Sequence, residues 1–222
     1  ADGGGLPDFL PGRHVTIRLA VQPGVEAGGR SYSLTGPATV PARRGYTIAV
    51  RRAGGTSATG EAVPGLVSSY INQRLAVGDL VALRAPSGSF VMPVRTRRPL
   101  VLLAGGIGIT PFLSLLESLE GIGDPPRILL LYANRNGQAH AFRARLRALR
   151  RQIPGLEIVD IYDRPDPCDR PGIDYDVAGR VGAEHVPAPW LAARPLVYMC
   201  GPAPMMSAFA DALAARGVHR AD

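Results

Sequence analysis

The stretch LLAGGIGITP, residues 102–111, decides how the second half of the chain is interpreted. Its apolar start is typical of a buried strand, and the glycines at 105, 106 and 108 form a turn where a ligand can approach the main chain. Pro111 stands in the first turn of a helix, which tolerates proline. Dinucleotides lie across the carboxyl ends of such strands, so the stretch predicts a nucleotide site. The spacing G-G-x-G-x-T-P is not G-x-G-x-x-G, and a tight strand–helix turn without a ligand is the alternative.

Apolar strands and helices alternate around this turn. The expected strands are residues 100–103, 128–132, 156–161 and 196–199, and the expected helices are residues 110–119, 139–151 and 203–216. Strands that are apolar throughout and alternate with helices form parallel sheets covered on both faces. We therefore expect an α/β parallel-sheet nucleotide-binding domain over residues 98–222.

The first part, residues 1–97, has a different rhythm. Residues 14–20, 46–52 and 80–85 alternate as strands do, and residues 66–75 place apolar side chains at helical spacing. Gly/Pro-rich turns lie between them. Several short strands with one helix predict a small antiparallel β-barrel.

The composition limits the classes of function. The chain has 222 residues, 46% of them hydrophobic, and a net charge of +7 that comes from arginine without any lysine. This excess indicates either a compositional bias or attraction of nucleotide phosphates or an acidic partner. The arginines are scattered without interleaved aromatics, so we expect no nucleic-acid binding. Glycines interrupt the longest apolar stretch, which argues against a membrane span.

The cysteine content also limits the options. The two cysteines, Cys168 and Cys200, form neither a disulfide framework nor a zinc-ligand pattern, and the four histidines show no ligand spacing. We therefore expect no metal site and a reducing, cytoplasmic compartment.

The segment RSYSL, residues 30–34, carries groups that suit a flavin. An aromatic ring such as that of Tyr32 can stack on a flat heterocycle, and a hydroxyl can bond its reactive nitrogen. The guanidinium of Arg30 suits a phosphate, and on a strand it shares a face with Tyr32. The alternative is an ordinary strand.

Two further motifs suit the same ligands. In PGLVSSY, residues 64–70, a glycine opens a helix whose free N–H groups suit a pyrophosphate, although simple N-capping by Ser68 explains the pattern equally well. In YMCGP, residues 198–202, Cys200 ends a strand at the same edge as the glycine turn, and packing in the core is the alternative role.

The order of these motifs resembles the ferredoxin–NADP reductase superfamily over almost the whole chain. The series is R-x-Y-S at 30–33, G-x-V-S at 65–68, G-G-x-G-x-T-P at 105–111 and C-G-P at 200–202. Within the superfamily the chain is most similar to the reductase part of flavohaemoglobins and to ferredoxin-fused bacterial flavin reductases. The additional similarities are DGG at 2–4, LPDF at 6–9, PG at 11–12, NRNG and HAF within 134–142, and YDRP at 162–165.

The resemblance implies a role for each matching residue. Arg30 would bind the FAD phosphates, Tyr32 would stack on the isoalloxazine, and Ser33 would lie near its reactive nitrogen. The other expected FAD contacts are Ser31, Val50, Arg51, Gly65, Leu66, Val67 and Ser68. The NAD(P)H site would comprise Gly105, Gly106, Gly108, Thr110, Pro111 and Arg135, with Cys200, Gly201 and Pro202 against the nicotinamide. Tyr32, Ser33 and Cys200 would thus touch the reacting rings.

The activity implied is hydride transfer from NAD(P)H to FAD and then electron release to an acceptor, a ferredoxin-like, globin or other module. The protein contributes mostly positioning. No acidic residue follows the strand ending at Tyr132, and Arg135 suits a 2′-phosphate, yet a solvated Arg135 is as plausible. We favour NADH and leave NADPH open. The rival hypotheses are a non-enzymatic FAD-binding relay or regulatory subunit, and a nucleotide-sensing module without flavin.

The chain also departs from the family pattern. It begins after the point where family members have formed their first barrel strand, and it stops at residues 219–222, where they add a last strand. We therefore expect a barrel incomplete at its N-terminus and a fragment of a longer protein.

Overall fold

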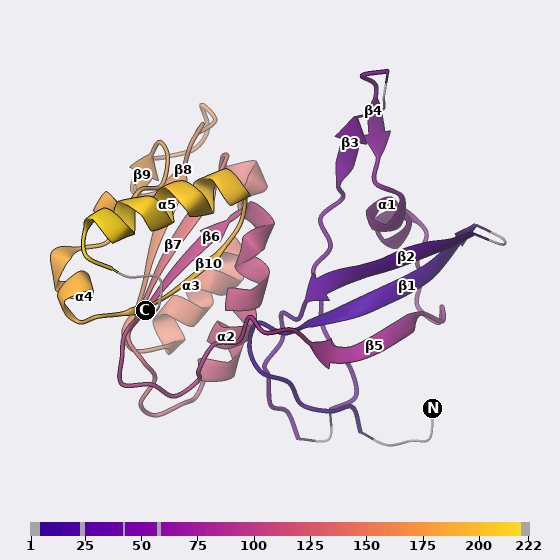
Figure 1. Cartoon of the computed structure of the whole chain (residues 1–222), viewed down its shortest axis with the longest axis horizontal. Coiled ribbons are helices and arrows are strands. Elements are labelled where there is room, and N and C mark those ends of the chain that lie inside the picture. Colours follow the sequence, from indigo (N-terminus) through magenta and orange to yellow (C-terminus); the bar gives the residue numbers. More distant parts are fainter. Residues whose placement is uncertain (1–4, 23–24, 42, 57–58, 219–222) are drawn as a thin grey trace.

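Two kinds of sheet divide the molecule into an antiparallel part and a parallel part (Figure 1). The computed structural model describes residues 5–22, 25–41, 43–56 and 59–218. The sequence predictions for residues 2–4 and for residues 219–222 therefore lie outside the described residues.

The antiparallel part has β1 at its centre. The three strands pair in the order β2-β1-β5, and their bounds are His14–Gln22 for β1, Val25–Ser33 for β2 and Ala82–Ser87 for β5. A separate ribbon of β3 (Gly54–Thr56) and β4 (Ala62–Pro64) leads into helix α1 (Leu66–Gln73). Within the described residues β2, β1 and β5 form one antiparallel sheet, which agrees with the antiparallel fold predicted for the first part of the chain.

Two small apolar clusters hold this part together. Ile17 and Leu19 of β1 pack with Val67 of α1, so the helix lies against the sheet. Phe9, Val15, Leu34 and Ala38 form the second cluster, next to the parallel part. The apolar core of the antiparallel part is thus small, because few of its side chains are fully buried.

The second part is a five-stranded parallel sheet in the order β10-β6-β7-β8-β9. The strand bounds are Leu100–Gly105 for β6, Ile128–Asn134 for β7, Leu156–Tyr162 for β8, Val177–Ala178 for β9 and Leu196–Cys200 for β10. The α-helix bounds are Thr110–Leu119 for α2, Arg143–Gln152 for α3, Ala188–Ala192 for α4 and Ala203–Ala215 for α5. The predicted α/β domain is confirmed.

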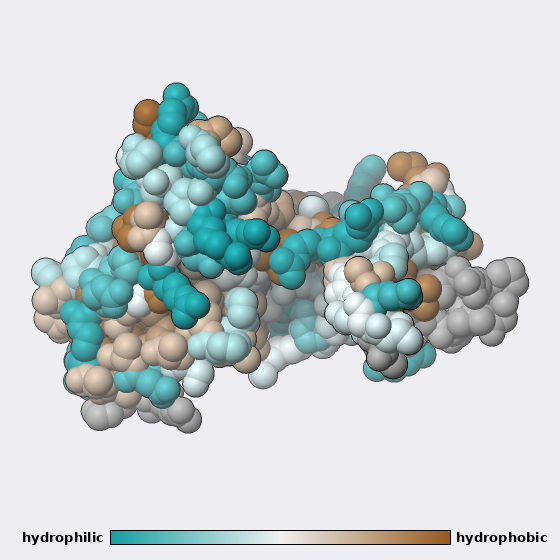
Figure 2. All heavy atoms as spheres, turned by 90° about the horizontal axis from the view of Figure 1, so that it is seen from above, coloured by the Kyte–Doolittle hydropathy of each residue, from teal (hydrophilic) through white to brown (hydrophobic). Residues whose placement is uncertain are grey.

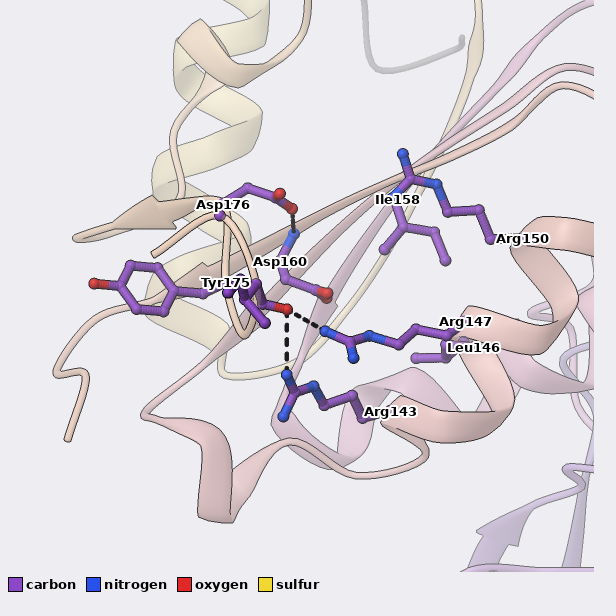
Figure 3. Close-up of a pocket in the computed structure, with 10 residues that line it drawn as sticks. Arg143, Leu146, Arg147, Arg150, Ile158, Asp160, Tyr175 and Asp176 are labelled. Carbon is purple, nitrogen blue, oxygen red and sulfur yellow. Dashed lines mark hydrogen bonds between the residues drawn. The ribbon is translucent and has the colours of Figure 1, made fainter. Parts of the chain in front are cut away.

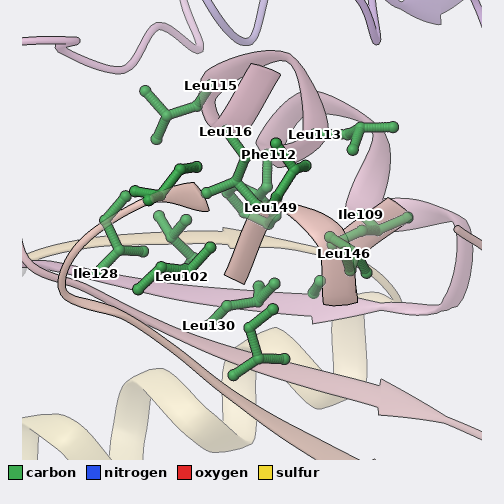
Figure 4. Packing of buried hydrophobic residues seen from close by; sticks show 14 of the residues in the cluster. Leu102, Ile109, Phe112, Leu113, Leu115, Leu116, Ile128, Leu130, Leu146 and Leu149 are labelled. Carbon is green, nitrogen blue, oxygen red and sulfur yellow. The ribbon is translucent and has the colours of Figure 1, made fainter. Parts of the chain in front are cut away.

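Helices cover both faces of the parallel sheet, as the apolar strands require. Phe112 and Leu116 of α2 and Leu149 of α3 pack on Leu102 and Leu130 of the sheet (Figure 4). On the other face, Trp190 of α4 and Phe209 of α5 pack against the alternate residues of β6 and β7. This double layer forms the larger core of the molecule.

Three predicted elements were placed wrongly. Residues 46–52 form no strand beyond an isolated bridge from Ile48 to Leu34, and the strand predicted at 80–85 runs from Ala82 to Ser87. The helix predicted at 139–151 begins only at Arg143, because Phe142 has φ of +58° and breaks it from a short 3-10 turn at Gly137–Ala139. Side-chain alternation does not reveal whether a partner strand or a local turn is present.

Helix α2 joins the two parts. Ser114 Oγ donates to the Gly36 carbonyl at 2.9 Å, and the Ala38 N–H donates to Ser118 Oγ at 2.8 Å. The Phe90 ring contacts the Phe112 ring edge-on, with centroids 6.1 Å apart. The segment that follows β2 therefore lies directly against the helix that follows the glycine turn.

Within the described part of the chain, no helix is long and apolar enough to cross a membrane.

Candidate functional site

The glycine turn after β6 has the geometry that the sequence predicted. Gly105 ends β6, a 3-10 turn runs over Gly106–Ile109, and α2 begins at Thr110 with Pro111 in its first turn. Gly106 has φ of +52°, a region that residues with a Cβ rarely adopt. No described atom lies within 4 Å of a Cβ placed on Gly106, so space for a ligand remains over it.

The CGP segment lies at the same edge of the sheet as this turn, as predicted, and packs against it. Strands β6 and β10 are neighbours, with Cys200 beside Ala104. A Cβ on Gly108 would meet the Cys200 carbonyl oxygen at 2.1 Å, and one on Gly105 would meet Pro202 Cδ at 2.7 Å. These glycines therefore allow the main chains of the two turns to touch.

The Cys200 side chain is half-buried at the edge of this pair of turns. It packs at the margin of the core between the sheet, α2 and α3. Burial raises the pKa of its thiol, so the group is neutral near pH 7. A neutral thiol there offers a small, polarizable contact rather than a nucleophile.

The predicted flavin strand is β2. Arg30 and Tyr32 share one face, and the pKa of the Tyr32 hydroxyl is raised by burial and lowered by the nearby Arg30 charge. The Arg30 guanidinium is exposed and donates to the carbonyls of Gly28 at 3.1 Å and Gly29 at 3.3 Å, which leaves donors for an anion. Ser31 points to the other face, where its Oγ lies 3.2 Å from Thr16 Oγ1. Ser33 is half-buried where β2 ends.

The start of α1 keeps its main chain close to residues 50–53. Gly65 N–H donates to the Ala53 carbonyl at 2.8 Å, and a Cβ on Gly65 would lie 2.9 Å from that oxygen. Ser68 Oγ accepts from Ala53 N–H at 3.1 Å and donates to the Gly65 carbonyl at 3.3 Å. The Ser68 hydroxyl is thus already engaged as a donor. Any anion at this helix start would therefore meet main-chain N–H groups.

The remaining expected FAD contacts surround α1. Val50 is half-buried, and its carbonyl accepts from Asn72 Nδ2 at 3.2 Å. Arg51 and Leu66 are exposed, and Val67 is buried against β1. Val67 therefore serves the core with its side chain.

The surface is recessed between the two parts when the molecule is seen from above (Figure 2). Residues 33–36 connect β2 to α2 through the Ser114–Gly36 hydrogen bond, and α2 starts at the glycine turn. Phe90, near the end of the antiparallel part, packs edge-on against Tyr198 of β10, with ring centroids 5.8 Å apart. These contacts bring the end of the predicted flavin strand and the two turns to the same junction.

Arg135 follows β7 at the carboxyl edge of the parallel sheet, and its side chain is exposed. Its carbonyl accepts from Arg164 N–H at 2.9 Å, so the main chains of the loops after β7 and β8 are joined. The Arg164 guanidinium lies 3.8 Å from the Asp163 carboxylate, which leaves the exposed Arg135 guanidinium as the group that suits a phosphate.

Sequence reasoning missed a buried polar group beside the glycine turn. His140 Nδ1 lies 2.7 Å from Tyr162 Oη, and His140 Nε2 lies 3.4 Å from Asp160 Oδ1. Burial lowers the pKa of His140 to about 4 and raises that of Asp160 to about 6. The available signal was the change from aliphatic to polar residues at the ends of two apolar strands.

Asp160 also lines a cavity of about 210 Å³ between α3 and the loop before β9. Arg143 and Arg147 of α3 both donate to the Ile173 carbonyl there, and Asp176 accepts from Asp160 N–H at 2.8 Å (Figure 3). The charged groups of this cavity thus mainly hold the loop to the helix.

The loop that carries Cys168 also has a structural role that the sequence did not reveal. Asp169 Oδ2 accepts from Gly137 N–H at 3.1 Å and from Asp166 N–H at 2.8 Å. The loops that follow β7 and β8 are therefore joined. Among the described residues, no cluster of His, Cys, Asp or Glu could hold a metal ion.

Comparison with known proteins places the chain among flavin-linked reductases. Residues 102–211 match the family model described as the oxidoreductase NAD-binding domain. The chain is 37% identical, over its whole length, to the flavohemoprotein of Rhizobium meliloti, of which it spans 53%. It thus covers about half the length of the curated relatives that it matches.

Two solved structures have similar folds. The flavohem-like FAD/NAD-binding domain of nitric oxide dioxygenase from Vibrio cholerae aligns with a TM-score of 0.79 and 30% identity, over 100% of this chain and 86% of the other. Phthalate dioxygenase reductase, described as a modular structure for electron transfer from pyridine nucleotides to [2Fe–2S], aligns with a TM-score of 0.64 and 28% identity over 96% of this chain and 56% of the other.

Proposed function

Because this chain belongs to the ferredoxin–NADP reductase superfamily and resembles the reductase part of flavohemoproteins, we propose that it is an FAD-dependent NAD(P)H oxidoreductase. It would take a hydride from NAD(P)H on FAD and release electrons to an acceptor. The supporting observation is the contact between the glycine turn and the CGP turn, beside the junction reached by the end of β2.

The residues present fit both cofactors. Arg30 has an exposed guanidinium for the FAD phosphates, and Tyr32 on the same face can stack on the flavin. The open space over Gly106 and its positive φ suit a coenzyme that approaches the main chain. Ser68 would act through the fold of the α1 start, since its hydroxyl already bonds Gly65 and Ala53.

The chain's own part in the reaction is positioning. The two cofactors, when bound, supply the hydride chemistry. Tyr32 and Ser33 would orient the flavin, and the Cys200 thiol, neutral because burial raises its pKa, would contact the nicotinamide without exchanging a proton. The close packing of the two turns would exclude water between them.

We propose an acceptor module that carries haem or an iron–sulfur centre. The support is that the chain matches part of a flavohemoprotein and the fold of a reductase described as serving [2Fe–2S]. The boundary between the two domains would lie near Arg97, before β6 begins. The small number of cysteines suits a cytoplasmic location.

Coenzyme choice is proposed to favour NADH, with NADPH as the second candidate. Arg135, exposed beyond β7, is the group that a 2′-phosphate would meet in the second case. Substituting Arg135 with Ala would then raise the KM for NADPH and leave the KM for NADH unchanged.

Anaerobic mixing of the FAD-loaded protein with NADH and with NADPH tests the proposal. Bleaching of the flavin absorbance by either coenzyme is the expected result. Bound flavin that neither coenzyme reduces would instead support the relay or regulatory subunit. A colourless protein that takes up no FAD would leave a nucleotide-binding module.

A further inference from the structure

The face of the parallel sheet under α2 and α3 changes from aliphatic to polar toward its carboxyl edge. Along β7 the residues on this face are Ile128, Leu130, Tyr132 and Asn134, and along β8 they are Leu156, Ile158, Asp160 and Tyr162. The last two on each strand are polar. Of these, Tyr132 reaches the glycine turn through its hydroxyl, whereas Asp160 lies against α3.

Tyr132 connects this polar end to the turn. Its side chain is fully buried, and its hydroxyl donates toward the Gly106 carbonyl at 3.1 Å, with the Ala141 carbonyl more distant at 3.4 Å. Gly106 is the residue whose φ of +52° shapes the turn. A buried phenol therefore holds the peptide group that a bound coenzyme would face.

The ring of Tyr132 is itself held by His140. The two rings meet edge-on with centroids 4.9 Å apart, and His140 is fixed by Tyr162 Oη at 2.7 Å. Burial raises the pKa of the Tyr132 hydroxyl, which therefore stays protonated and acts as a donor. The donor thus has both a fixed place and a fixed protonation state.

We propose that Tyr132 is a positioning residue for the coenzyme, which holds the Gly106 peptide in the conformation that NAD(P)H binds. This inference rests on the proposed function, because the turn is taken as the coenzyme site. The phenol itself does not touch the coenzyme. It acts through the main chain, by holding the Gly106 carbonyl in place.

Substitution of Tyr132 with Phe tests the inference, because it keeps the ring and removes the hydroxyl. The free turn then samples other conformations, and we expect the Kd of NAD⁺ and the KM of the reduced coenzyme to rise about three- to tenfold, the effect of losing one hydrogen bond. The rate of flavin reduction at saturating coenzyme and the FAD affinity should stay the same. Calorimetry with NAD⁺ measures the Kd without turnover.

Tyr162→Phe is the matched control. It removes a hydroxyl from the same polar group, but that hydroxyl bonds His140 and not Gly106. Because His140 keeps its edge-on contact with Tyr132, we expect Tyr162→Phe to lower the free energy of unfolding and to raise the Kd of NAD⁺ clearly less than Tyr132→Phe does. Hydrogen exchange of the amides of residues 106–110 should accelerate more in Tyr132→Phe than in Tyr162→Phe.

Two results would overturn the inference: an unchanged Kd in Tyr132→Phe, or an equal rise in both variants, which would indicate general loosening. Either result is distinct from failure of the proposed function. If the proposed function failed, the unsubstituted, FAD-loaded protein would bind neither NAD⁺ nor NADP⁺.

Discussion

The hydroxyl of Ser114 donates a hydrogen bond to the carbonyl of Gly36 at 2.9 Å, across the junction of the two sheets. Ser114 is completely buried in α2, and Gly36 follows β2 by three residues. Ser118, one turn later, accepts from Ala38 N–H. Hydrogen bonds from one helix thus contribute to the relative placement of the predicted flavin strand and the glycine turn.

Substitution of Ser114 with Ala should therefore destabilise the protein. The Gly36 carbonyl would lose its partner, which costs about 1–3 kcal/mol in the free energy of unfolding. Urea denaturation measures the change. Ser207→Ala, on an exposed position of α5, is the control and should leave the midpoint unchanged. Equal midpoints for both variants would show that the junction does not depend on this bond.

Substitution of Arg30 with Ala should weaken FAD binding. It removes a charge-assisted contact to phosphate, worth roughly 1.5–3 kcal/mol, or about 10- to 100-fold in Kd. Arg84→Ala removes an equally exposed arginine from β5 and should keep the FAD affinity. Flavin fluorescence on titration gives both constants. Unchanged binding in Arg30→Ala would mean that the phosphates lie elsewhere.

The two cysteines should differ in reactivity. Cys168 is exposed, whereas Cys200 is half-buried with a thiol pKa raised by desolvation. Because thiolate is the reactive form, iodoacetamide at pH 7.5 should label Cys168 first, as read by mass spectrometry.

Cys200→Ala should slow flavin reduction by NADH and keep the fold. An unaltered rate would assign Cys200 to packing alone.

Substitution of Gly108 with Ala should separate the two turns. Its Cβ would lie 2.1 Å from the Cys200 carbonyl oxygen, so the backbone must shift, at a cost of about 1–3 kcal/mol. Gly123→Ala, with no atom of the described residues within 4 Å of its Cβ, is the control. Thermal denaturation and NAD⁺ titration should both be affected by the first substitution only. A Gly108→Ala variant with unaltered stability and affinity would contradict this packing.

The Asp160–His140 pair should have opposing effects on stability in acid. The pKa of Asp160 is raised to about 6, so its contribution to stability is present at low pH and is lost as the pH rises through 6. The pKa of His140 is lowered to about 4, so its contribution is present above its ordinary pKa and is lost as the pH falls toward 4. The two effects largely cancel between pH 4 and 6.

Asp160→Asn removes the contribution of the Asp160 carboxyl to stability at low pH and leaves the contribution of His140. The free energy of unfolding should then fall more steeply from pH 6.5 to pH 4.5 than in the unsubstituted protein. His140→Gln should give the opposite slope. Urea denaturation at three pH values measures both. Parallel pH profiles for all three proteins would show that neither group titrates as the structure indicates.

The sequence predicted the parallel part well. Continuous apolar runs such as residues 100–103 identify buried strands, and the helix at Thr110–Leu119 has the predicted bounds because a glycine turn and Pro111 mark its start. The antiparallel part was less predictable. Residues 46–52 alternate as a strand does, yet pairing depends on partners that are distant in sequence.

In the candidate site, too, some features could be predicted from the sequence and others could not. The sequence predicted that the glycine turn and Cys200 lie at the same edge of the sheet, whereas the contact of Gly108 with Cys200 depends on the pairing of β6 with β10, which the structure shows. The engaged Ser68 hydroxyl and the buried His140 could not be foreseen, because each depends on where a loop folds back. The roles assigned to the individual FAD and coenzyme contacts stay predictions.

The main-chain contact between Gly108 and Cys200 has an energetic consequence. Two turns that touch through their backbones keep few alternative arrangements before a ligand arrives. Little conformational entropy is then lost on association, so affinity can come from modest contacts. A site of this kind should bind its ligand without first rearranging, so the association rate should be high.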